Sequence, residues 1–128
     1  MKMGLDMYAF SVSKADAGDF QTDLPKDDDQ QVNQFFYWRK FNALHGWMQN
    51  LYYSKGGEKE SFNCTTVRLD AEDLNRLLKE ANSLKPVSGF FFGDQTVYPE
   101  DRESIDTFVN MALAEIADGK VVYYDCWW

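Results

Sequence analysis

A chain of 128 residues, 45% of them hydrophobic, is long enough to bury one core and too short for two ordinary domains, so we expect a single domain over residues 1–128. Its 21 acidic residues outnumber 13 basic ones, and the formal charge of −8 argues against direct binding of nucleic acid phosphates. No apolar run approaches the roughly 18 residues of a membrane span, and the first residues lack a secretion signal. We therefore expect a cytoplasmic protein that does not contact a membrane.

The metal-binding and nucleophilic residue types are sparse. Cys64 and Cys126 lie far apart without CxxC or Cys/His spacing, which argues against a zinc site and a disulfide framework. His45 is the only histidine, and the carboxylates around it have no recognisable ligand spacing. No local motif places a Ser or Cys beside His45 as a nucleophile. We expect no metal, no cofactor and no enzymatic activity.

The N-terminal part of the chain is predicted to form a strand and then a loop. Residues 5–12 are rich in Met, Tyr, Phe and Val and alternate imperfectly, as strands do. Residues 13–30 carry Gly18, Pro25 and the run Asp27–Asp29 with few apolar residues to bury, which predicts an exposed acidic loop.

Residues 31–53 carry the apolar spacing of a long helix. Tyr37, Phe41, Leu44, Met48 and Leu51 recur at intervals of three or four residues, which predicts one stripe facing the core. The segment that follows, SKGGEKE, is typical of a turn.

The C-terminal half is predicted to contain two strands and two helices. Residues 62–69 are rich in β-branched residues and predict a strand, after which Asp70 is suited to cap a helix over 71–84. Pro86 breaks that helix. A further helix is predicted to begin at Pro99 and to stop at Gly119, and residues 120–128 predict a final strand.

This order, β-α-β-α-α-β, predicts a small α+β domain whose mixed or antiparallel sheet is covered by about three helices. The string SGFFFG is either an additional strand or a bend whose phenylalanines plug the core. A doubly wound α/β sheet is the less favoured alternative, and neither GxGxxG nor GxxxxGK[ST] occurs in the sequence.

The helix predicted over 31–53 is the one basic element of an acidic chain, because it contains two basic residues and no acidic ones. Its donors and aromatic rings could hydrogen-bond a phosphate, a base edge or a carboxylate and stack on a planar ring. A purely structural role for the same side chains is the competing interpretation. The candidate ligand-binding residues are Trp38, Arg39, Lys40, Asn42 and His45.

Residues 86–128 contain eight acidic and two basic residues, and they include aromatic clusters. Such a surface could imitate the phosphates of DNA and occupy the basic groove of a nucleic-acid-binding protein, although charged faces are often only solvated. Exposed aromatics could dock on the same partner. The candidate partner-binding residues are Phe91, Asp94, Glu100, Asp101, Glu103, Asp106, Glu115, Asp118, Trp127 and Trp128.

Four strings carry a resemblance to a known family. MGLDMYAF, YWRKFNALHGW, SGFFFGD and the aromatic C-terminal strand together resemble a family of small phage and prophage proteins of unassigned function, over most of the chain. The resemblance implies a phage or mobile-element origin and therefore the cytoplasm of a host cell. Many small acidic phage proteins act by binding a host or defence component, and this is an analogy of class only.

The leading functional expectation is a phage-type accessory protein that binds and modulates a host or defence protein, such as an anti-CRISPR or another anti-defence inhibitor, through its acidic face and exposed aromatics. The alternative is a small-molecule or nucleotide binder, acting as a sponge or an enzyme, that uses the basic aromatic segment. A third hypothesis is a homodimer in which Trp and Phe clusters meet across a two-fold axis.

Overall fold

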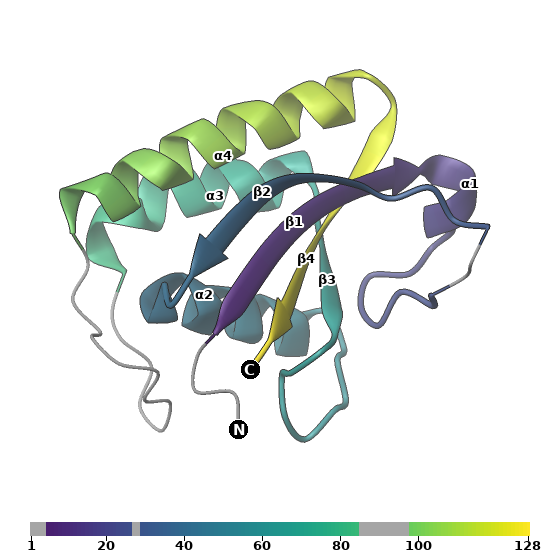
Figure 1. Ribbon diagram of the computed structural model, residues 1–128, viewed down its shortest axis with the longest axis horizontal. Helices are drawn as coiled ribbons and strands as arrows, with labels where there is room; N and C mark the ends of the chain where they lie inside the picture. Colours follow the sequence, from purple (N-terminus) through teal and green to yellow (C-terminus); the bar gives the residue numbers. More distant parts are fainter. Residues whose placement is uncertain (1–4, 27–28, 85–97) are drawn as a thin grey trace.

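The computed structural model describes residues 5–26, 29–84 and 98–128. The chain has the α+β fold that the sequence predicts, with one antiparallel sheet of strand order β2-β1-β4-β3 (Figure 1). The strands are β1 (Asp6–Ser13), β2 (Asn33–Arg39), β3 (Thr66–Leu69) and β4 (Lys120–Trp127). The helices are α1 (Lys14–Ala17), α2 (Asn42–Ser54), α3 (Ala71–Glu80) and α4 (Pro99–Ala117), with a 3-10 turn η1 (Ala81–Ser83) after α3. None of the helices in the described ranges is long and apolar enough to cross a membrane.

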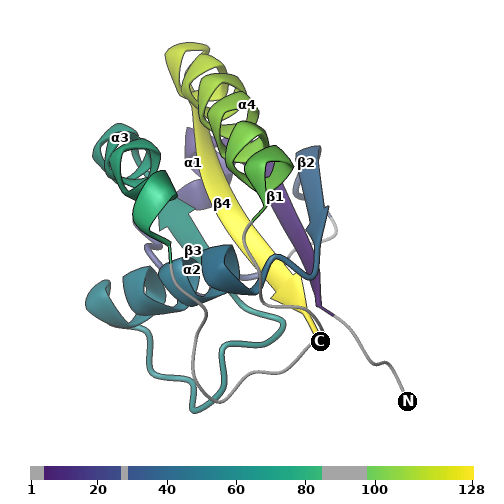
Figure 2. The same ribbon diagram turned by 90° about the vertical axis from the view of Figure 1, so that its left-hand side faces the viewer.

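The two faces of the sheet are covered to different extents, because successive side chains of a strand point to opposite faces. On one face, Met7 of β1 and Tyr124 of β4 are fully buried and belong to the main core, to which α2, α3 and α4 contribute. Figure 2 shows these three helices in front of the strands and α1 behind them. On the other face, which we call the open face, the described residues form a smaller second core. That core consists of Phe10, Val12, Ala17, Leu24, Val121 and Tyr123.

Helix α3 begins where the sequence predicts. The Asp70 carboxylate accepts a hydrogen bond from the Asp73 amide at 2.9 Å, and the Asp73 carboxylate accepts one from the Asp70 amide at 3.0 Å. This reciprocal pair is a capping box, which satisfies two donors that the first turn of a helix leaves without partners. The Lys55 ammonium also contacts Asp73, at 2.5 Å, and links the end of α2 to the start of α3.

Replacing Asp70 by Ala is expected to lower the free energy of unfolding by about 1 kcal/mol, because the cap is lost and the N-terminal amides of α3 remain unsatisfied. Urea denaturation of both proteins measures the difference. Glu72→Ala is the matched control, because Glu72 is an exposed acidic residue of the same turn and its loss should cost less than about 0.5 kcal/mol. Equal losses in the two variants would contradict the capping role.

Helix α4 and strand β4 also follow the sequence closely. Pro99 is the first residue of α4, and Gly119 has a φ of +85° just after its end, where its amide donates to the Ile116 carbonyl at 2.9 Å. A left-handed φ at this position favours glycine, so Gly119 turns the chain directly from α4 into β4.

The single helix predicted over residues 31–53 is wrong in its first half. Residues 33–39 form β2, and α2 begins only at Asn42. Lys40 has a φ of +59°, a left-handed conformation that interrupts regular structure, and its amide donates to the Leu5 carbonyl at 2.8 Å. The aromatic run in NQFFYWR favours an extended backbone. The Trp38 ring packs edge-on against the ring of Phe108 on α4, with ring centroids 4.8 Å apart. Burial of these rings outweighs the helical spacing.

The prediction of an exposed loop over residues 13–30 is also wrong in part. Residues 14–17 form α1, and Ala17 and Leu24 are buried in the second core. Residues 21–23 run beside β3, where the Asp23 amide donates to the Thr66 carbonyl at 3.0 Å. Two apolar residues are enough to hold this segment because backbone and side-chain hydrogen bonds to it supply the remaining contacts.

The strand predicted over 62–69 is shorter than expected, since β3 begins at Thr66 and Cys64 has a left-handed φ of +56°. Phe62 is fully buried in the main core without belonging to a strand.

The SGFFFG string lies outside the described residues, so its role as a strand or a bend remains a prediction.

Candidate functional site

One row of side chains crosses the open face from one edge of the sheet to the other. Tyr37 of β2 is the cross-strand partner of Tyr8, Tyr8 pairs with Asp125, and Asp125 pairs with Thr66 of β3. Directly opposed residues of antiparallel strands point to the same face, so these four side chains form a line that we call the central row. The Tyr8 and Tyr37 rings are tilted against each other with centroids 5.4 Å apart.

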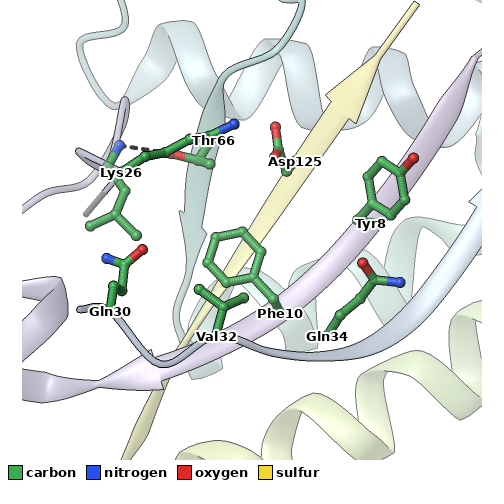
Figure 3. Close-up of a pocket in the computed structure, with 9 residues that line it drawn as sticks. Tyr8, Phe10, Lys26, Gln30, Val32, Gln34, Thr66 and Asp125 are labelled. Carbon is green, nitrogen blue, oxygen red and sulfur yellow. Dashed lines mark hydrogen bonds between the residues drawn. The ribbon is translucent and has the colours of Figure 1, made fainter. Parts of the chain in front are cut away.

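A hollow of about 350 Å³, the open-face hollow, lies over this row and is bounded by the segment that precedes β2. Figure 3 shows Tyr8 and Gln34 on one side of it, Gln30 on the other side, and Phe10 and Val32 between them. Helix α1 lies only at the end of the open face where β1 finishes, and the hollow lies beyond it (Figure 1). Its lining residues are Tyr8, Phe10, Leu24, Lys26, Gln30, Val32, Gln34, Thr66 and Asp125.

Asp125 is the acidic residue of this hollow. Burial raises the pKa of its carboxyl, and the Cys126 amide and the ammonium groups of Lys26 and Lys59 offset only part of that effect. The Cys126 amide donates to Oδ1 at 2.8 Å, whereas no side chain within the described ranges donates to this carboxyl. The carboxyl therefore has acceptor capacity that a ligand in the hollow could use.

A second hollow of about 270 Å³, the lysine hollow, adjoins the first and shares Leu24, Lys26 and Thr66 with it. Its remaining lining residues are Asp23, Lys59, Cys64 and Thr65. Burial raises the pKa of Asp23, but hydrogen bonds from Thr65 and Tyr52 and the charge of Lys59 outweigh it and hold the pKa below its usual value. Lys59 Nζ lies 3.7 Å from Asp23 Oδ1.

The structure does not bring the five candidate ligand-binding residues together. Trp38 is buried in the main core, where its Nε1 donates to the Ser104 hydroxyl at 3.1 Å. Asn42 and His45 are buried on α2, while Arg39 and Lys40 are exposed at the end of β2. Because Trp38 lies on β2 rather than on α2, it shares no helix face with Asn42 and His45.

His45 is buried against Tyr124 and Phe62. Its Nδ1 lies 2.8 Å from the Tyr124 hydroxyl, and its ring stacks on Phe62 with centroids 5.1 Å apart. Burial lowers the pKa of His45 to about 4, so the imidazole is neutral at pH 7.

The candidate partner-binding residues fall into separate places. Glu100, Glu103, Asp106 and Asp118 are exposed along or just after α4, but the Asp101 carboxylate accepts from the Tyr98 amide at 2.9 Å. Glu115 accepts hydrogen bonds from Ser11 and Asn33 and so joins α4 to the sheet. Phe91 and Asp94 lie outside the described residues.

The two C-terminal tryptophans differ from each other. Trp127 is half exposed and follows Asp125 by two positions on β4, so it belongs to the open face. Trp128 packs against the main core, and its Nε1 donates to the Phe62 carbonyl at 3.0 Å. Trp127 is therefore the more exposed of the pair.

The residues of the open-face hollow belong to no motif, and sequence reasoning missed them. One signal was present in KVVYYDCWW, where alternation places Asp125 on the same face as Val121 and Tyr123. A carboxylate on an otherwise apolar strand face marks either an exposed edge or a site. Its partners Tyr8 and Lys26 come from the other end of the chain, and only the register of the sheet assembles them.

Within the ranges that the structure describes, no three His, Cys, Asp or Glu residues are grouped as metal ligands. The open-face hollow instead offers a stacking ring, two amide side chains and a carboxyl, which suits an organic ligand. No protein-family model, curated protein or solved structure matches this chain. Its function therefore has to be inferred from the geometry and chemistry of the site.

Proposed function

We propose that this protein binds a small organic molecule in the open-face hollow. The observation that carries the proposal is the Asp125 carboxyl, which lies in a largely aromatic and aliphatic hollow and accepts no side-chain hydrogen bond within the described ranges. Sites for small molecules typically have volumes of roughly 300–1,000 Å³, apolar walls and a few polar groups that fix the ligand's orientation. The hollow, at about 350 Å³, lies within this range.

The lining defines the chemistry of the ligand. Tyr8 offers a ring face for stacking, and Asp125 favours an N–H or O–H donor. The amides of Gln30 and Gln34 each supply a donor and an acceptor near the rim. A flat molecule with a donor edge therefore satisfies the lining better than an aliphatic chain does.

Filling the hollow tests this function. Val32→Trp adds a large ring at its lining, and Met111→Trp adds the same ring to the exposed side of α4, where the native side chain is similarly exposed. Ligand-observed NMR with a library of small aromatic amides should detect binders of the native protein and of Met111→Trp, and Val32→Trp should lose them. Binding that survives Val32→Trp unchanged would rule out this hollow.

A second candidate function follows from α4. Glu103 and Asp106 are exposed less than one turn apart on this helix, away from the main core. They support the phage-type accessory function, an anti-defence inhibitor whose acidic face docks in the basic groove of a host protein. Glu103→Lys combined with Asp106→Lys should abolish capture of such a basic protein from host lysate, and Val32→Trp should retain it. Capture by the double variant would exclude this face.

A further inference from the structure

The open-face hollow and the lysine hollow adjoin each other and differ in their chemistry. Leu24, Lys26 and Thr66 line both hollows. The open-face hollow offers Tyr8, Gln34 and Asp125, the lysine hollow has Lys59, and Lys26 lines both. A ligand that occupies both hollows has a planar ring with hydrogen-bond donors, joined by a short spacer to an anion.

From this arrangement we propose that the ligand is a free guanine nucleotide, whose base occupies the open-face hollow and whose phosphate binds Lys26 and Lys59. The proposal rests on the proposed function, since it names the ligand class of the same hollow. It goes beyond that function by assigning the lysine hollow to the phosphate.

The base is assigned from the carboxyl. Guanine presents two adjacent donors, N1–H and the N2 amino group, which match the two oxygens of one carboxylate side by side. Adenine and cytosine place an acceptor beside their amino group, and uracil flanks its one N–H with two carbonyls, so each would turn an acceptor toward Asp125. Gln34 lies across the hollow, where its amide can donate to guanine O6 or N7, and the Tyr8 ring offers a stacking face.

The phosphate is assigned from the lysines. Lys26 lines both hollows, and no acidic group of the described residues forms an ion pair with it. Lys59 is half exposed and contacts Asp23, whose carboxylate is already occupied by hydrogen bonds from Tyr52 and Thr65. A phosphate here would meet two ammonium groups and one carboxylate that is already engaged.

The charge of the whole chain favours a free nucleotide over a nucleic acid strand. A mononucleotide places its phosphate beside two lysines, whereas a strand would carry further phosphates across a protein of net charge −8. A guanine nucleotide at the end of an RNA strand is therefore expected to bind less tightly than the free nucleotide.

Calorimetric titration with guanosine 5′-monophosphate (GMP), AMP, guanosine and inorganic phosphate tests both assignments. We expect GMP to bind at least tenfold more tightly than AMP and than guanosine. Lys26→Gln should weaken GMP binding several-fold more than it weakens guanosine binding, because Lys59 remains at the phosphate and Lys26 also lines the hollow of the base. Asp125→Asn should reduce the affinity for both guanine compounds and abolish the preference for GMP over AMP. Lys79→Gln and Asp106→Asn remove the same charges from exposed positions on α3 and α4 and should change affinity less than twofold.

Several outcomes overturn the proposal. Equal affinities for GMP and AMP, or a preference that survives Asp125→Asn, would refute the guanine assignment, provided that the variant melts within a few degrees of the native protein. Unchanged GMP binding by Lys26→Gln would refute the phosphate site. Tighter binding of a guanine-rich single-stranded oligoribonucleotide than of GMP would refute the free nucleotide. If aromatic amides still bind and Val32→Trp blocks them, the proposed function stands without this ligand class.

Discussion

Replacing Phe108 by Ala is expected to lower the free energy of unfolding by about 3–5 kcal/mol, the largest effect we predict for a single side chain. Phe108 is fully buried on α4 and contacts three rings of β2, with centroids 6.1 Å from Phe35, 5.7 Å from Phe36 and 4.8 Å from Trp38. The pairing of β1 with β2 shifts register between Ala9 and Phe10, so that Phe35 and Phe36 both reach Phe108. The substitution leaves a cavity among these rings.

Guanidinium denaturation measures this loss. The dependence of the unfolding free energy on denaturant concentration should have the same slope in the native protein and the variant. Met111→Ala is the control on the same helix, because Met111 is exposed and its removal should cost less than about 1 kcal/mol. Phe108→Leu should fall between the two, since it retains most of the buried volume. If Phe108→Ala costs no more than Met111→Ala, the aromatic contact between α4 and β2 is not formed.

The protein is expected to lose about 3 kcal/mol of stability through His45 as the pH falls from 6.5 to 4. Burial lowers the pKa of His45 from 6.5 to about 4, so between these values the unfolded chain binds a proton that the folded protein does not. This contribution to stability is fully present above pH 6.5. It falls as the pH decreases and is gone below about pH 4.

The measurement compares urea denaturation of the native protein and of His45→Gln between pH 7.5 and pH 4. Asp125 titrates with the opposite sign, because its raised pKa makes a stabilising contribution that is lost as the pH rises through the folded-state pKa. Subtracting the two curves cancels that term, since both proteins contain Asp125. A difference between the two proteins that stays constant across this pH range would show that His45 is protonated as readily in the folded protein as in the unfolded chain.

Local signals in the sequence identify several elements of the fold correctly. The Asp70 cap, the Pro99 start, the Gly119 stop and the β-branched and aromatic composition of β4 each act within a few residues, so the chain itself carries the information. The segment containing β2 shows where such signals fail. Its apolar spacing fits a helix, but contact with Phe108, far along the chain, selects the strand.

The candidate site was less predictable than the fold, because it consists almost entirely of long-range pairings. Tyr8 and Asp125 face each other only through the register of β1 with β4, and Lys26 is carried to them by the contacts of residues 21–24 with β3. The sequence instead drew attention to Trp38 and His45, whose aromatic and polar groups the structure uses inside the main core. A polar side chain near aromatic rings has the same sequence signature in a core as in a site.

The most direct test of the central claim, that the open-face hollow is the binding site, follows the backbone amide resonances of the labelled protein. GMP and the tightest-binding aromatic amide are titrated separately into the protein. We predict that each shifts the amides of Tyr8, Gln34, Thr66 and Asp125 in a saturable manner and leaves those of Glu103 and Asp106 unchanged. Saturable shifts confined to α4, with the hollow unaffected, would contradict the account.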